Sequence, residues 1–128
     1  MTVKPKVGFL IAAAAAAYTA GRHVFKGAEA IGIPIRDSEA LSATARWMGY
    51  YVWHMVSATV VLMALGFLWA AVRPDAKSAG QLLTVLAALF AGLALWIALS
   101  AGFDLAKMFP LHAFLVVALA GGWSSFRG

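Results

Sequence analysis

The sequence predicts an all-α integral membrane protein in which four transmembrane helices form an up-down bundle. Hydrophobic residues make up 63% of the 128 residues, whereas a soluble domain is usually about 45–50% apolar even when glycine is counted. The apolar residues are also gathered in four stretches, each close to the roughly 20 residues that a spanning helix needs. We therefore expect one four-helix transmembrane domain over residues 1–128.

The first span is predicted at about residues 7–25. Its centre is a run of alanines that begins at Ala12. Alanine gains little from contact with lipid but lets helices approach closely, so this span is expected to pack against its neighbours. Residues 24–36 follow, and because they contain two glycines and Pro34 around an apolar centre, we predict an interfacial loop there.

The second span, at about residues 47–72, is the most strongly apolar. Asp37 and Ser38 are residue types that cap helix N-termini well, so the helix itself is expected to begin there. Its length would then be about 50 Å, which exceeds the hydrocarbon thickness of a bilayer. The first turns of this helix should therefore project beyond the membrane.

The third and fourth spans are predicted at about residues 82–102 and 110–123. Pro110 suits the first turn of the fourth span, where its missing N–H costs no hydrogen bond. In the second, third and fourth spans, small residues recur at a spacing of four, which allows close helix contact in lipid. The pairs are Gly66 and Ala70, Ala88 and Gly92, Ala94 and Ala98, and Ala118 and Gly122.

The distribution of basic residues gives only a weak indication of the orientation of the chain in the membrane. Four spans place both termini on one side, and the ten basic residues divide equally between the two sides, so the positive-inside rule does not choose between them. The long connection dilutes its own charges, and on that ground we expect cytoplasmic termini, in a bacterial-type inner membrane. Because short, alanine-rich helices bury little surface, we also expect a homo-oligomer or a larger membrane complex.

Several function classes are disfavoured by the sequence. The net charge of +5 is spread over termini and connections, which suits anionic lipid head groups and offers no concentrated basic patch for nucleic acid. The absence of cysteine excludes thiolate metal sites and thiol catalysis. No serine nucleophile motif or glycine-rich phosphate loop is found, so enzyme activity stays undecided.

The three histidines are the best indication of a site. His23, His54 and His112 all fall near the membrane face opposite the termini, and ionisable groups in a membrane are costly and often functional. Tyr50, His54 and Ser57 follow the three-and-four spacing of one helix face. We predict that spans one, two and four form a shallow ligand-binding pocket bordered by Tyr50, His54, Ser57 and His112.

Alternative functions stay open at this stage. His54 and His112 would suit a haem b held between facing helices. A divalent metal could instead be held by His54, His112, His23 and Asp104. A third possibility is a non-catalytic accessory or assembly subunit, or a small oligomeric transporter, although a transporter would be expected to carry a charge in mid-membrane. A plainer interpretation places His54 in an interfacial aromatic belt.

Overall fold

The computed structural model describes residues 6–127, and every regular element in this range is helical. Residues 1–5 and 128 of the predicted domain lie outside the described residues. The elements are α1 (Val7–Arg22), the π-helix η1 (His23–Gly32), α2 (Ile33–Asp37), α3 (Ala43–Val72), the 3₁₀ turn η2 (Pro74–Ala76), α4 (Lys77–Ala101), the 3₁₀ turn η3 (Leu105–Lys107) and α5 (Phe109–Phe126).

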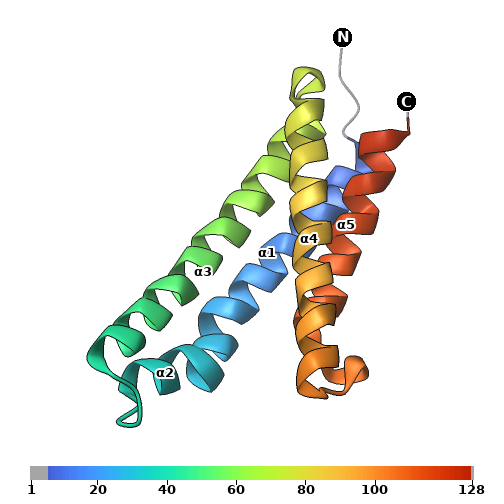
Figure 1. Cartoon of the computed structure of the whole chain (residues 1–128). Coiled ribbons are helices and arrows are strands. Elements are labelled where there is room, and N and C mark those ends of the chain that lie inside the picture. The colour runs from blue at the N-terminus through green and yellow to red at the C-terminus, as the bar shows by residue number, and fades with distance from the viewer. Residues whose placement is uncertain (1–5, 128) are drawn as a thin grey trace.

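The described residues contain four helices that are long and apolar enough to cross a membrane. The first joins α1, η1 and α2 into one continuous stretch, Val7–Asp37, and the fourth is α5. The all-helical class and the four apolar helices predicted from the sequence are thus confirmed. The described ends of the chain lie together at one end of the molecule (Figure 1).

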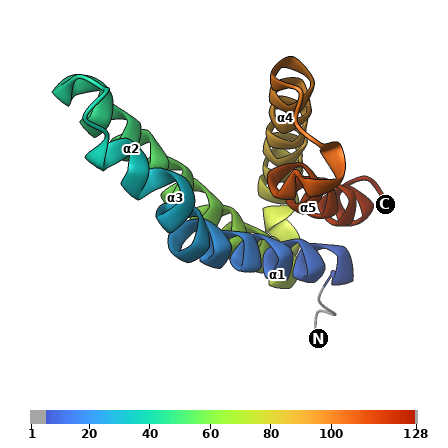
Figure 2. The same cartoon turned by 90° about the horizontal axis from the view of Figure 1, so that it is seen from below.

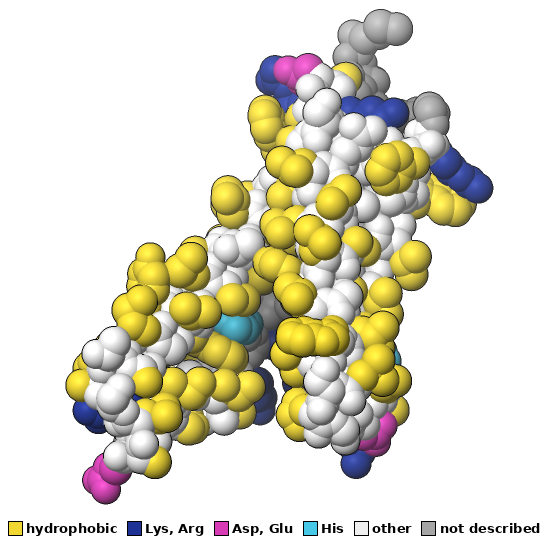
Figure 3. All heavy atoms as spheres, viewed as in Figure 1, with side chains coloured by type: hydrophobic (Ala, Val, Ile, Leu, Met, Phe, Trp, Pro, Cys, Tyr) yellow, Lys and Arg dark blue, Asp and Glu magenta, His cyan; other side chains and the backbone are white. Residues whose placement is uncertain are grey.

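The four long helices form two pairs that diverge. α1 packs against both α3 and α5, and α5 also packs against α4, whereas α3 and α4 share a smaller contact. The α1–α3 pair and the α4–α5 pair separate toward the end that carries α2 (Figures 1 and 2). The space-filling view shows the surface hollowed between the two pairs at that end (Figure 3).

Small side chains make the helix contacts possible. Every buried residue of α4 is alanine, glycine or threonine, and α1 buries mostly alanine and glycine. A side chain on Gly80 would collide with the ring of Phe9, which is fully buried and lies 5.9 Å from the Phe67 ring. The buried residues of α4 are Gly80, Thr84, Ala87, Ala91, Ala94 and Ala98.

A group of buried polar residues joins α1, α4 and α5 near the termini. The backbone N–H of Phe9 donates to Ser124 Oγ at 3.2 Å, and the hydroxyl groups of Thr84 and Ser125 lie 3.2 Å apart. Gln81 Nε2 donates to the carbonyl oxygen of Ser125 at 3.2 Å. Because each of these groups has a partner, their burial carries no large desolvation penalty.

The interfacial loop predicted at residues 24–36 is a helix instead. The glycines in this stretch adopt helical winding, and Pro34 falls in the first turn of α2, where a proline is tolerated. The predicted start of the second long helix at Asp37 or Ser38 is also wrong. Asp37 ends α2 and pairs with Arg36, and the N-cap of α3 is Ser42, whose hydroxyl accepts from the N–H of Ala45 at 3.2 Å.

Candidate functional site

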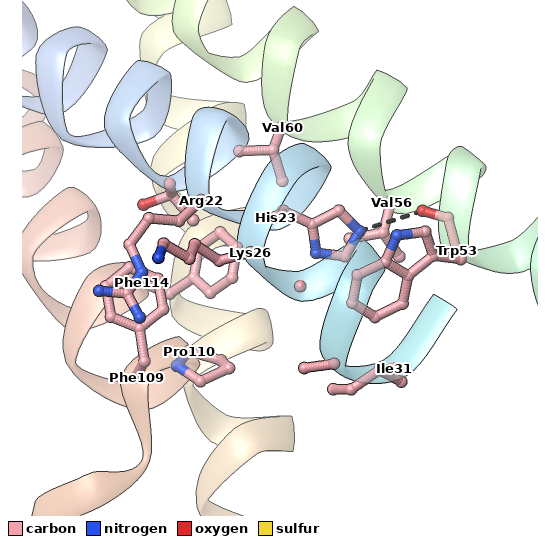
Figure 4. A pocket seen from close by; sticks show the side chains of 13 residues that line it. Arg22, His23, Lys26, Ile31, Trp53, Val56, Val60, Phe109, Pro110 and Phe114 are labelled. Carbon is pink, nitrogen blue, oxygen red and sulfur yellow. Dashed lines mark hydrogen bonds between the residues drawn. The ribbon is translucent and has the colours of Figure 1, made fainter. Parts of the chain in front are cut away.

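A cavity of about 530 Å³ lies between α1, η1, α3 and α5 (Figure 4). It is at the end of the molecule away from the termini, where Figure 3 shows the surface hollowed between the two helix pairs and basic side chains in the opening. Its walls are mainly apolar. The lining residues are Thr19, Arg22, His23, Lys26, Gly27, Ala30, Ile31, Trp53, Val56, Val60, Phe109, Pro110 and Phe114.

The π-helix η1 brings three of its residues onto one tryptophan of α3. The ring of His23 stacks on the Trp53 indole, with centroids 3.8 Å apart and planes 14° apart. A Cβ atom at Gly27 would lie 2.8 Å from Trp53 Cζ2, and one at Gly32 would lie 3.0 Å from Trp53 Cδ1. Both glycines therefore leave room for the indole to approach the helix backbone.

Ordinary α-helical winding would not produce this contact. Gly32 follows His23 by nine residues, which is about two and a half turns of an α-helix, so the two would lie on opposite faces. The i→i+5 hydrogen bonds of a π-helix widen each turn and let both residues face Trp53. The π-helix is therefore what positions His23 at the cavity.

The polar groups around Trp53 are unevenly satisfied. His23 Nε2 donates to the carbonyl oxygen of Trp53 at 3.1 Å, and the same oxygen accepts from Ser57 Oγ at 3.2 Å. The buried indole N–H of Trp53 has no acceptor among the described residues. The hydrogen bond from His23 requires a proton on Nε2 when the ring is neutral, so Nδ1 is then the unprotonated nitrogen.

Two cations form the other side of the cavity. The Arg22 guanidinium lies 4.2 Å from the centroid of the Phe109 ring, within range of a cation–π contact. Figure 4 shows Arg22 and Lys26 toward Phe109 and Phe114, and His23 turned toward Trp53. Neither Arg22 nor Lys26 forms a salt bridge with an acidic residue in the described range, whereas Arg36 and Arg73 are each paired with a nearby aspartate.

Only some of the predicted ligand-binding residues lie near this cavity. Ser57 is buried and contacts Trp53, but it does not line the space. Tyr50 and His54 stack edge to face at 4.4 Å on α3, next to the Arg36 guanidinium and outside the cavity. His54 is exposed, as an interfacial aromatic belt would place it.

The predicted metal ligands are not brought together. The described residues contain no group of three or more His, Asp or Glu side chains that could hold a metal ion. His23, as described, is bonded to Trp53, His112 Nε2 donates to the Leu105 carbonyl oxygen at 2.8 Å, and Asp104 Oδ1 accepts from the Ala106 N–H at 3.0 Å. Each of these three side chains is therefore engaged in a hydrogen bond with a backbone group.

The arrangement also gives no support to the haem site predicted from His54 and His112. Both side chains are exposed, and neither lines the cavity between their helices. α1 contacts both α3 and α5 and provides the wall on which the cavity is built. A porphyrin held by these two residues would have to lie outside this cavity.

The cavity is formed by the three spans from which a pocket was expected, but by different residues. Arg22, Lys26 and Trp53 were not predicted as site residues. The sequence signal that could have identified Trp53 is a second stripe on the same helix with the spacing of one helix face, formed by Trp53, Val56, Ser57 and Val60. In the structure this stripe is more buried than the stripe that contains Tyr50 and His54. No residue-type pattern indicates the π-helix on which Lys26 lies, directly after Arg22 at the end of α1.

Comparison with known proteins gives no match to a family model, to a curated protein or to a solved structure.

Proposed function

We propose that the four long helices cross a membrane in up-down order, with both termini on one side. Large apolar side chains that face outward on every long helix support this. Leu62, Leu82 and Leu119 each expose about two thirds or more of their surface, at 66%, 71% and 73%. An apolar exterior of this kind suits lipid and would cause association in water. We keep the sequence-based expectation of a bacterial-type inner membrane with cytoplasmic termini.

We propose further that the protein binds a small, largely apolar molecule from the bilayer in the cavity beside η1. The observation that carries this proposal is the cavity itself: its volume of about 530 Å³ is within the range of about 300–1,000 Å³ found for ligand pockets. Its walls are apolar, with few polar groups, which is the usual character of such pockets. The function supported is ligand binding, and nothing about the site calls for catalysis.

The position of the cavity along the helices favours a ligand supplied by the membrane. α1 runs from Val7 to Arg22, so Arg22 lies about 22 Å along the helix from Val7. The hydrocarbon core of a bilayer is about 30 Å thick. A cavity bordered by Arg22 and by the start of α5 would then lie just inside the boundary of the bilayer opposite the termini.

Photolabelling with a long-chain alcohol that carries a diazirine near the end of its chain tests this proposal. The purified protein in lipid nanodiscs is labelled, and the adducts are mapped by mass spectrometry, with and without excess unlabelled alcohol. We expect labelling of cavity residues that the excess alcohol suppresses. Ala30→Trp places a large ring at the cavity wall and should reduce the suppressible labelling at least fivefold.

Ala17→Trp is the matched control, because Ala17 is exposed and does not line the cavity. It should leave the suppressible labelling unchanged. Labelling that no excess of alcohol suppresses, or that Ala30→Trp leaves intact, would reject the ligand-binding proposal. The non-catalytic accessory subunit predicted as an alternative would then become the better interpretation.

A further inference from the structure

We propose that the ligand of this cavity is a single-chain amphiphile with an anionic head group, a carboxylate or a phosphate monoester, held between Arg22 and Lys26. This inference rests on the proposed ligand-binding function and specifies its ligand class. It is carried by the charges on the cavity wall, by their lack of partners and by the size of the space.

The charged side chains at the cavity all have one sign. Arg22 and Lys26 line it, His23 stands beside them, and no aspartate or glutamate is among the lining residues. Glu29 is the acidic residue nearest in sequence, and it is exposed on η1 and unpaired with either cation. A bound anion would therefore meet only attraction from the wall.

The two cations have not been neutralised by the protein. Arg36 and Arg73 each form an ion pair with an aspartate one or two residues away, at 2.7 Å and 3.2 Å. Arg22 and Lys26 have no such partner in the described chain, and the Arg22 guanidinium rests on the Phe109 ring. Both side chains are exposed, so a head group at the opening of the cavity can reach them.

The geometry matches the shape of an amphiphile. Arg22 ends α1 and Lys26 lies on η1, and across the cavity from them Val56 and Val60 of α3 and Phe114 of α5 provide apolar surface (Figure 4). A chain could lie along these three residues while its head group meets the cations. The volume of about 530 Å³ corresponds to one drug-sized molecule, which favours one acyl chain over a two-chain phospholipid.

Competition against the diazirine alcohol measures the head-group preference. The competitors are a fatty acid, a monoalkyl phosphate and an alcohol of equal chain length, compared at pH 8. We expect the two anions to compete at about tenfold lower concentration than the alcohol, as hydrogen bonds to charged groups imply. In the double variant Arg22→Gln, Lys26→Gln this preference should disappear while competition by the alcohol persists.

Two control proteins separate head-group recognition from general charge or misfolding. Lys77→Gln with Arg127→Gln removes two cations at the opposite end and should retain the preference. Arg22→Lys with Lys26→Arg keeps both charges and should also retain most of it. For each variant we compare the concentration of anion that suppresses labelling with the concentration of alcohol that does so. Because this ratio is taken in the same nanodiscs for every variant, differences in how the competitors partition into the lipid cancel.

The outcomes distinguish this inference from the function on which it rests. Suppression by the alcohol without any preference for anions would overturn the head-group assignment and leave the ligand-binding proposal standing. If the preference for anions survives in the double variant Arg22→Gln, Lys26→Gln, other residues must recognise the head group. That result would also overturn the inference. Absence of suppression by any competitor would reject the proposed function itself. A stronger effect of the phosphate than of the carboxylate, or the reverse, identifies the head group.

Discussion

Trp53 shows how one side chain can determine the geometry around a site. Its indole is held between the His23 ring and the backbone of η1 at Gly27 and Gly32. Stacked aromatic pairs of this kind contribute about 0.5–1.5 kcal/mol beyond the area that they bury. The hydrogen bond from His23 to the Trp53 carbonyl oxygen fixes the same contact from the other direction.

Gly27→Ala is predicted to destabilise the fold because of this contact. The new Cβ atom would lie 2.8 Å from Trp53 Cζ2, and the indole cannot retreat without losing its stacking on His23. Overpacking of this kind costs about 1–3 kcal/mol, which exceeds the gain of up to about 1 kcal/mol from replacing a helical glycine by alanine. Unfolding by sodium dodecyl sulfate, followed by circular dichroism, measures the difference.

Gly92→Ala is the matched control for this prediction. A Cβ atom at Gly92 would meet nothing within 4 Å, and Gly92 also lies within a helix. Stability should therefore stay the same or rise by up to about 1 kcal/mol. Equal stability changes in the two variants would show that the Trp53 contact does not restrain η1.

At the residue scale, the interpretation of His54 as part of an interfacial aromatic belt agrees with its exposure, whereas the burial of Ser57 was not predicted. His54 belongs to an exposed aromatic cluster, and Ser57 is buried against its neighbours. The role of His23 could not be read from the sequence, because its partner Trp53 is thirty residues away and is reached only through π-helical winding.

Among the elements, α4 is the clearest case in which small side chains determine packing. Ala87 is fully buried, whereas its neighbour Ala88 is exposed. Adjacent helix positions differ by about 100° in direction, so these two alanines point to different surroundings. Their chemistry is identical, and only the packing distinguishes them.

Ala87→Leu is accordingly predicted to lower stability by about 1–3 kcal/mol, since the larger side chain would separate α4 from its neighbours. Ala88→Leu should change stability by less than about 0.5 kcal/mol, as surface substitutions usually do. Both are measured by the same detergent titration. If Ala88→Leu instead changes the oligomeric state in analytical ultracentrifugation, the Ala88–Gly92 stripe belongs to a contact between protein chains.

The elements also show where sequence-based prediction succeeds and where it fails. The apolar stretches identify all four long helices, because the length and hydrophobicity that they require are properties of local sequence. Residues 24–36 were expected to be a loop because glycine and proline usually interrupt helices. Trp53 occupies the space beside the two glycines of this helix, and tertiary contacts of this kind routinely outweigh local propensity.

For the whole molecule, the divergence of the two helix pairs accounts for the cavity. The polar and small-residue contacts that join α1, α4 and α5 lie near the termini, and the pairs separate away from them. The sequence predicted which three spans would border a pocket, because spans that alternate in direction bring the same ends together. It could not predict the lining, which depends on the angles between helices.

The proposed membrane topology can be tested directly because the sequence contains no cysteine. Ser78→Cys places a thiol at the start of α4, near the end that carries the termini, and Ala40→Cys places one in the connection between α2 and α3 at the opposite end. Both native residues are exposed. If the helices span the membrane with cytoplasmic termini, a membrane-impermeant maleimide applied to intact spheroplasts should label Ala40→Cys and leave Ser78→Cys unlabelled until the membrane is opened.

The reverse pattern would retain the four crossings and invert the orientation, which the tied charge count of the two sides leaves open. Equal labelling of both sites before the membrane is opened would contradict the spanning arrangement. That result would also remove the reason for expecting a ligand from the bilayer, because the depth of Arg22 and of the cavity follows from α1 crossing the membrane. Orientation has a further consequence: it decides whether an anionic amphiphile reaches Arg22 and Lys26 from the outer or from the inner leaflet.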